Sequence, residues 1–291
     1  MISREELDAL TESITRAILA QIEAEGTCHC HEIGLSRCPN VIRGLVDGGA
    51  ERLGLHADPH HHGTSLGRMI DHTLLKPDAT ESQIRKLCEE AAQYGFATVC
   101  VNPTWVRLAS SLLKGTPVGV CTVVGFPLGA NTADVKIYET RRALFDGATE
   151  IDMVINVGAL KSQDYKLVES DIVGVVCCCQ EAGALSKVII EAALLNQEEK
   201  IKASTLTAAA GADFVKTSTG FGPGGATVED VALMRQVVGE KMGVKAAGGV
   251  RDAATATKMV EAGATRIGAS AGIRILQEAG RPKPAKRSAK Y

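Results

Sequence analysis

Four charged residues interrupt otherwise apolar segments of the sequence. They are Asp71 in RMIDHT (68–73), Asp152 in EIDMVINVG (150–158), Lys216 in FVKTST (214–219) and Lys245 in GVKAAGG (243–249). Burying a lysine or an aspartate is costly unless the charge is paired, so two of each sign indicate a working charge network. The alternative is a pair of structural salt bridges, but such bridges seldom need lysine in preference to arginine.

The two lysines predict amine chemistry. A desolvated lysine beside a second ammonium group loses its proton easily and becomes nucleophilic toward a carbonyl. Lys216 and Lys245 lie on adjacent predicted strands, so one of them must give up its proton to relieve the repulsion. Asp152 can then move protons, directly or through water, and Asp71 can orient a lysine or a substrate hydroxyl.

Small residues gather near the ends of three segments, 214–219, 243–249 and 266–272, and they predict an anion site. They are Ser218-Thr219-Gly220, Gly248-Gly249 and Gly268-Ala269-Ser270. Glycine exposes backbone N–H groups, and together with hydroxyls and helix N-termini these groups hold a phosphate without a basic side chain. Glycines also end strands at ordinary turns, so the spacing of these groups carries the argument.

The elements that must position these residues alternate between short β-rich segments and longer amphipathic ones. The β-rich segments are RMIDHT (68–73), ATVCVN (97–102), VGVCTVVGF (118–126), EIDMVINVG (150–158), KVIIEA (187–192), FVKTST (214–219), GVKAAGG (243–249) and RIGASAG (266–272). Helical patterns such as ESQIRKLCEEAAQYG and VEDVALMRQVVGE lie between them.

This alternation predicts an α/β fold, a (β/α)8 TIM barrel, with its active site at the C-terminal ends of the strands. A doubly wound open sheet is the alternative, but it normally has a Gly-rich phosphate turn after its first strand. Here Asp71-His72-Thr73-Leu74 occupies that place.

Composition excludes some classes of function. The chain has 291 residues, 45% of them hydrophobic, and a net charge of −2, so no overall field favours nucleic acid or an anionic membrane. No apolar run approaches the roughly 18 residues that span a bilayer. Nine cysteines, three of them consecutive, fit a reducing compartment better than a disulfide framework. We therefore expect a cytoplasmic protein with no nucleic-acid or membrane partner.

Seven motifs in order resemble the deoxyribose-phosphate aldolase family, over about residues 67 to 276. They are IDHTLLKP (70–77), ATVCVNP (97–103), VVGFPLG (123–129), EIDMVIN (150–156), FVKTSTGF (214–221), VKAAGGVR (244–251) and RIGAS (266–270). The resemblance implies a class I aldolase that reversibly cleaves 2-deoxyribose 5-phosphate into glyceraldehyde 3-phosphate and acetaldehyde, with no metal or organic cofactor. Two alternatives remain open, namely another phosphosugar lyase or isomerase and a non-catalytic scaffold.

By this resemblance Lys216 is the Schiff-base lysine, Asp152 the proton-transfer carboxylate and Lys245 the second lysine that perturbs the first. The positions that hold the phosphate are Thr219, Gly220, Gly248, Gly249 and Ser270, and Asp71 is a further substrate-binding candidate. Many relatives carry a second serine after Ser270, where this chain has Ala271.

Residues 1–65 form an extension to the expected barrel domain, 66–276. The segment 3–25 has apolar residues at helical spacing and a capping box at Ser3 and Glu6. It resembles the N-terminal helices that target enzymes to bacterial microcompartments, where it would bind shell or cargo. A helix packed on its own barrel or on a neighbouring subunit is the alternative.

The Cys/His-rich linker 26–65 contains Cys28, Cys30 and Cys38, whose spacing differs from familiar zinc modules and leaves metal binding open. Residues 277–291 form a basic tail that ends in Tyr291, and we expect it to be flexible. We also expect a homo-oligomer, although the sequence does not give its size.

Overall fold

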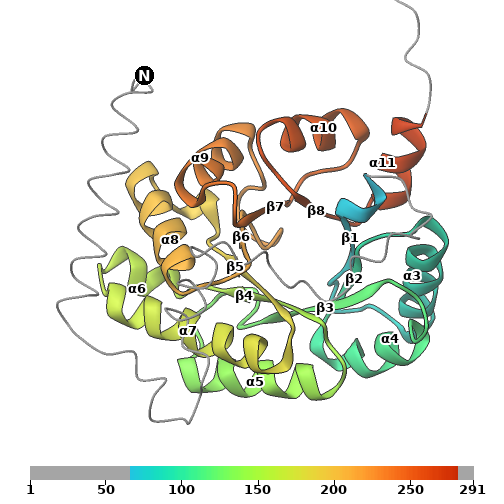
Figure 1. Cartoon of the computed structure of the whole chain (residues 1–291), viewed down its shortest axis with the longest axis horizontal. Helices are drawn as coiled ribbons and strands as arrows, with labels where there is room; N and C mark the ends of the chain where they lie inside the picture. Colours follow the sequence, from blue (N-terminus) through green and yellow to red (C-terminus); the bar gives the residue numbers. More distant parts are fainter. Residues whose placement is uncertain (1–65, 281–291) are drawn as a thin grey trace, which may run out of the picture.

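The computed structural model describes residues 66–280. The predicted targeting helix, the linker cysteines and Tyr291 lie outside the described residues. Within that range, eight parallel strands run in sequence order around a closed barrel, and β1 pairs with β8 to complete it. Figure 1 shows the helices outside this ring. The predicted (β/α)8 barrel is therefore confirmed.

The strands are short. They are β1 (Ile70–Leu74), β2 (Thr98–Val101), β3 (Gly119–Val124), β4 (Glu150–Val154), β5 (Leu185–Ile189), β6 (Phe214–Lys216), β7 (Gly243–Ala247) and β8 (Arg266–Ala269). Most end two to four residues before the predicted segment does. The residues that follow them belong to the loops at the C-terminal ends of the strands, where such barrels build their sites.

The α-helices of the described range form the outer layer (Figure 1). They are α3 (Glu81–Tyr94), α4 (Val106–Leu112), α5 (Ala133–Phe145), α6 (Val157–Lys161), α7 (Tyr165–Ala182), α8 (Gln197–Ala209), α9 (Val228–Val238), α10 (Ala253–Glu261) and α11 (Gly272–Ala279). Short 3-10 turns are η2 (Gly67–Met69), η3 (Pro103–Trp105) and η4 (Ala192–Leu194). No helix of this range is long and apolar enough to cross a membrane.

The sequence of α3 explains its bounds. The Thr80 N–H donates to Oε1 of Gln83 at 2.9 Å, which satisfies one of the amides at the start of the helix. Its apolar residues face the barrel, namely Ile84, Leu87, Cys88 and Ala91. Gly95 ends the helix with a left-handed φ of 65°, a conformation that glycine adopts without steric cost.

The hydrophobic core lies between the sheet and the helices, whereas the inside of the barrel is charged. Residues such as Ile70, Val99 and Val244 point outward into the core and are fully buried. Side chains at alternate strand positions point the other way. Among these, Asp71, Asp152, Lys187, Lys216 and Lys245 are all buried as well.

Candidate active site

Lys216 and Lys245 meet at one oxygen. They are register partners on β6 and β7, so their side chains project into the barrel side by side. Lys216 Nζ lies 2.7 Å from Oδ2 of Asp152, and Lys245 Nζ lies 2.6 Å from the same oxygen. The structure thus brings together the three residues that the sequence singled out for amine chemistry.

Asp71 forms an ion pair with Lys245 inside the barrel. Its Oδ2 lies 2.5 Å from Lys245 Nζ, and its Oδ1 accepts from Arg266 at 2.7 Å and from the Thr98 hydroxyl at 2.8 Å. Asp71 is the second residue of β1, so it lies toward the start of its strand. Fully buried, with each oxygen already facing a cation, it acts on the site through Lys245.

Three further charged residues complete the interior, and sequence reasoning missed them. Lys187 on β5 lies 2.8 Å from Oδ1 of Asp152 and 2.5 Å from Oε2 of Glu150. Arg266 lies 3.0 Å from the same Glu150 oxygen. Each of the three stands first in its predicted β-rich segment, where a charged residue looks like an ordinary solvent-facing end. Their inward direction follows from the closed barrel.

The ion pairs set the protonation of the site. Burial alone would raise the pKa of Asp152, but the three ammonium groups around it outweigh that cost and hold the pKa well below its usual range. Burial opposes the charge of Lys245, yet the carboxylates of Asp152 and Asp71 raise its pKa above the usual value. Lys245 therefore stays a cation next to Lys216.

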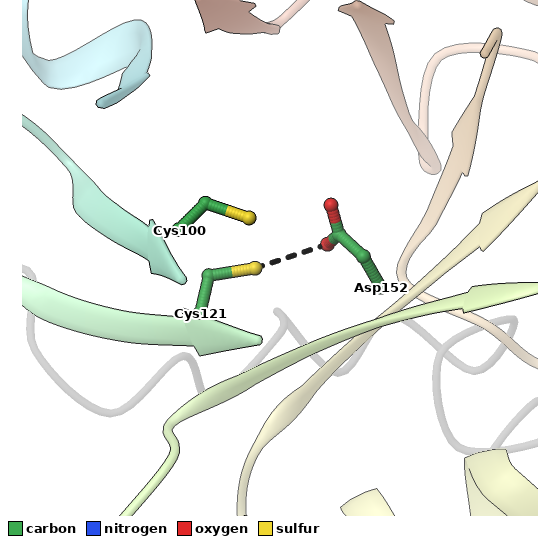
Figure 2. Close-up of side chains that lie close together, drawn as sticks. All are labelled: Cys100, Cys121 and Asp152. Atoms are coloured by element: carbon green, nitrogen blue, oxygen red, sulfur yellow. Dashed lines mark hydrogen bonds between the residues drawn. The ribbon is translucent and has the colours of Figure 1, made fainter. Parts of the chain in front are cut away.

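Two thiols line the same side of the barrel. Cys100 and Cys121 are register partners on β2 and β3, and Figure 2 shows both pointing toward Asp152. The Cys121 thiol donates to Oδ1 of Asp152 at 3.1 Å. A hydrogen bond with Cys121 lowers the pKa of Cys100, whereas burial raises that of Cys121.

The ligand atoms of Cys100, Cys121 and Asp152 lie within 4.8 Å of one another, a spacing that fits a metal ion. The Lys187 ammonium already contacts two of these three residues. Its Nζ lies 3.3 Å from the Cys121 sulfur and 2.8 Å from the Asp152 carboxylate, whose charge it neutralises. A divalent cation would have to displace it. The ammonium supplies the positive charge that a metal would otherwise bring.

The predicted phosphate residues lie on three neighbouring loops, after β6, β7 and β8. Gly220 and Gly249 have φ values of 84° and 82°, and a Cβ at either position would meet nothing within 4 Å. Ser270 is exposed and lies two residues before α11. Exposed glycine amides and a hydroxyl beside a helix N-terminus form a surface that suits an anion.

Thr219 differs from the other predicted phosphate residues because it is buried and already bonded. Its N–H donates to Oε2 of Glu191 at 3.2 Å, and its hydroxyl donates to the same oxygen. Glu191 follows β5 and was not predicted. It has a left-handed backbone, with φ of 50°, which is uncommon for a residue with a side chain and which no sequence pattern reveals.

The fold and the interior define a protein of the (β/α)8 barrel class with paired lysines on β6 and β7, of which Lys216 lies at the C-terminal end of its strand. The chain belongs to the DeoC/LacD aldolase family, whose family model matches residues 66–278.

Curated relatives agree over the same range. The chain is 63% identical to a deoxyribose-phosphate aldolase of Geobacillus sp. (strain WCH70), over 73% of this chain and 95% of that protein. It is 64% identical to a deoxyribose-phosphate aldolase of Halalkalibacterium halodurans, with the same coverage.

A solved structure of deoxyribose phosphate aldolase from Aeropyrum pernix, described as tetrameric, matches with a TM-score of 0.69 and 35% identity, over 81% of this chain and 96% of that one. The family resemblance found in the sequence is therefore confirmed.

Proposed function

We propose that this chain catalyses the reversible cleavage of 2-deoxyribose 5-phosphate into glyceraldehyde 3-phosphate and acetaldehyde. In the direction of synthesis, the Lys216 amine adds to the acetaldehyde carbonyl, and loss of water gives a Schiff base. Removal of a proton from the methyl carbon forms an enamine, which attacks the aldehyde of glyceraldehyde 3-phosphate. Hydrolysis then frees Lys216 and the product.

The observation that carries this proposal is the shared oxygen of Asp152. Two ammonium groups on one carboxylate oxygen repel each other, and Lys245 is the one held by a second carboxylate, that of Asp71. Lys216 is therefore the amine that gives up its proton and attacks. It is also the last residue of β6, at the end of the strand where substrate arrives.

Asp152 is the proposed proton carrier. Its carboxylate lies within hydrogen-bond distance of the Lys216 nitrogen, so it reaches the atoms that gain and lose protons while the carbinolamine dehydrates. Lys187 binds the other oxygen at 2.8 Å and fixes the carboxylate plane. Lys245 stays protonated and holds the carboxylate in place through its direct contact with Oδ2.

The substrate phosphate is proposed to bind at Gly220, Gly248, Gly249 and Ser270. Support comes from the open backbone at Gly220 and Gly249 and from the exposed Ser270 hydroxyl before α11. The Gly248 carbonyl accepts from the Ala226 N–H at 2.9 Å, which fixes the direction of the loop after β7.

The test is borohydride trapping with acetaldehyde, followed by peptide mass analysis. An ethyl group is expected on Lys216 and on no other lysine, and Lys216→Ala should lose both the label and the cleavage of 2-deoxyribose 5-phosphate. Lys161→Ala, which removes a half-exposed lysine paired with Glu199, is the control that keeps both. Labelling elsewhere, or activity with dihydroxyacetone phosphate as donor in place of acetaldehyde, would contradict the proposal.

We further propose that the chain forms a homo-oligomer and that segment 3–25 targets it to a bacterial microcompartment. Support for the oligomer is the relative described as tetrameric. Support for targeting is the apolar stripe of segment 3–25 in the sequence. Deleting residues 1–25 should abolish co-localisation with a shell and leave aldolase activity intact, and retained co-localisation would refute the targeting role.

A further inference from the structure

We propose that Glu191 is a positioning residue that shapes the turn Thr219–Gly222 and thereby sets the preference of the site for a phosphorylated sugar. This inference rests on the proposed function, because it concerns the loop that would hold the substrate phosphate. Glu191 comes from a different βα unit, between β5 and α8, and nothing in the sequence pattern points to it.

The backbone around Glu191 is bonded to the lysine strand on both sides. The Ile190 N–H donates to the Lys216 carbonyl at 3.0 Å, and the Ala192 N–H donates to the Thr217 carbonyl at 2.8 Å. Glu191 stands between these bonds with φ of 50° and ψ of 61°. A non-glycine residue keeps this conformation only where its surroundings impose it, and such residues gather at functional sites.

The carboxylate of Glu191 forms the inner support of the turn. Its Oε2 accepts from both the N–H and the hydroxyl of Thr219, and that hydroxyl oxygen in turn accepts from the Phe221 N–H at 3.1 Å. A Cβ on Gly222 would lie 3.0 Å from Cδ of Glu191, so the backbone there packs directly on the carboxylate. One side chain therefore contacts or organises the turn from Thr219 to Gly222.

These hydrogen bonds change the role expected of Thr219, which the sequence predicted to bind phosphate. Its N–H and hydroxyl both serve Glu191, so they are not free to bind phosphate. The phosphate donors of this turn then come from its exposed glycine backbone, at Gly220 or Gly222. Thr219 then acts as the link that transmits the position of Glu191 to the phosphate-binding backbone.

The second oxygen of Glu191 gives the carboxylate a further constraint. Glu191 is 4% exposed, and its Oε1 is buried with no hydrogen-bond partner among residues 66–280. A buried carboxylate oxygen without a partner is costly, so the surrounding fold must hold it in place. Such a group is kept for the geometry that it enforces rather than for stability.

The test compares two substrates, 2-deoxyribose 5-phosphate and unphosphorylated 2-deoxyribose. For Glu191→Ala we expect kcat/KM to fall at least about tenfold with the phosphorylated substrate, mainly through KM, because a charged hydrogen bond that shapes the binding turn is lost. The value with 2-deoxyribose should stay within about twofold. Glu191→Gln retains an oxygen that can accept from Thr219 and should recover most of the preference.

Glu199→Gln is the matched control. Glu199 lies in the same βα unit and binds Lys161 and the Asn196 N–H on the exposed side of α8, so the ratio of the two substrates should not change. An equal loss with both substrates in the Glu191 variants, or an unchanged ratio, would overturn the positioning role. Acetaldehyde trapping at Lys216 needs no phosphate, so failure of trapping in the unmodified protein would count against the proposed function instead.

Discussion

Lys216 and Lys245 are register partners on neighbouring strands, and both bind Oδ2 of Asp152. The two nitrogens are therefore close, but their surroundings differ. Lys245 also lies 2.5 Å from Asp71, whereas Lys216 stands at the end of its strand. A fixed cation beside an amine that must become neutral is the relationship on which the proposed chemistry depends.

Replacing Lys245 by methionine removes that cation and keeps much of the side-chain volume. Without this repulsive neighbour a neutral amine is less favoured, so we expect the pH profile of borohydride trapping to move toward alkaline pH and its rate near neutrality to fall about tenfold. Lys245→Arg keeps the charge and should retain the original profile, even where altered geometry lowers activity. Identical profiles for the methionine variant and the unmodified protein would rule out this role.

Replacing Asp152 by asparagine should affect both stability and activity. The change leaves three buried ammonium groups around a neutral amide, and breaking a buried ion pair in this way costs about 3–5 kcal/mol in the free energy of unfolding. Cleavage should fall by about 10²- to 10⁴-fold, as expected for loss of a proton carrier. Asp146→Asn, which loses contacts to Arg107 and Arg142 at the surface, should change urea denaturation only slightly.

The lowered pKa values of Asp152 and Asp71 make the free energy of unfolding depend on pH in the acid range. Their ion partners lower both pKa values, so they contribute stability above the ordinary carboxyl pKa of about 4 and lose it as the pH falls toward the folded values. Urea denaturation at a series of pH values should show this decline. Asp152→Asn should have a shallower acid limb, and an equally steep limb in that variant would contradict the assignment.

Lys187 and Lys245 affect stability at the alkaline end of the pH range instead. The surrounding carboxylates raise the pKa values of Lys187 and Lys245, so their stabilising contribution is complete below about pH 10, the ordinary range, and is lost as the pH rises through the folded values. We therefore expect the free energy of unfolding to be nearly constant from about pH 5 to 9. Lys187→Met should abolish part of the alkaline decline, as measured by denaturation above pH 9.

A second buried pair lies outside the catalytic interior. Lys136 on α5 binds Asp171 on α7 at 2.5 Å and the Val154 carbonyl at 2.8 Å. Burial lowers the pKa of Lys136 and raises that of Asp171, so the fold disfavours both charges. Lys136→Met should cost about 3–5 kcal/mol because it strands Asp171, and the double change Lys136→Met with Asp171→Leu should recover most of that loss. A double variant no more stable than Lys136→Met would refute this explanation.

The fold was predictable from the sequence because periodicity survives in a single chain. Alternating β-rich and amphipathic segments located all eight strands, and the predicted helix at 81–95 differs by one residue from α3 (Glu81–Tyr94). The strands were predicted too long because apolar residues such as Ile155 and Ile190 remain buried after the strand has ended. Burial, rather than strand geometry, produces the apolar pattern that the sequence displays.

The candidate site was predictable only in part. Asp152, Lys216 and Lys245 were found because a charge in the middle of an apolar segment is conspicuous. Glu150 and Arg266 stand first in their strands, where charge is unremarkable, and they become interior residues only when the barrel closes. Glu191 depends on a left-handed backbone imposed by its neighbours, and local sequence does not encode that.

The contact between Asp71 and Arg266 joins residues that are 195 positions apart, on the first and last strands of the barrel. During synthesis the N-terminal strands leave the ribosome long before β8 exists. Until then Asp71 lacks its guanidinium partner, and a nascent chain cannot build the charged interior in stages. Because contacts of such long range slow folding, we expect the charged interior to form late.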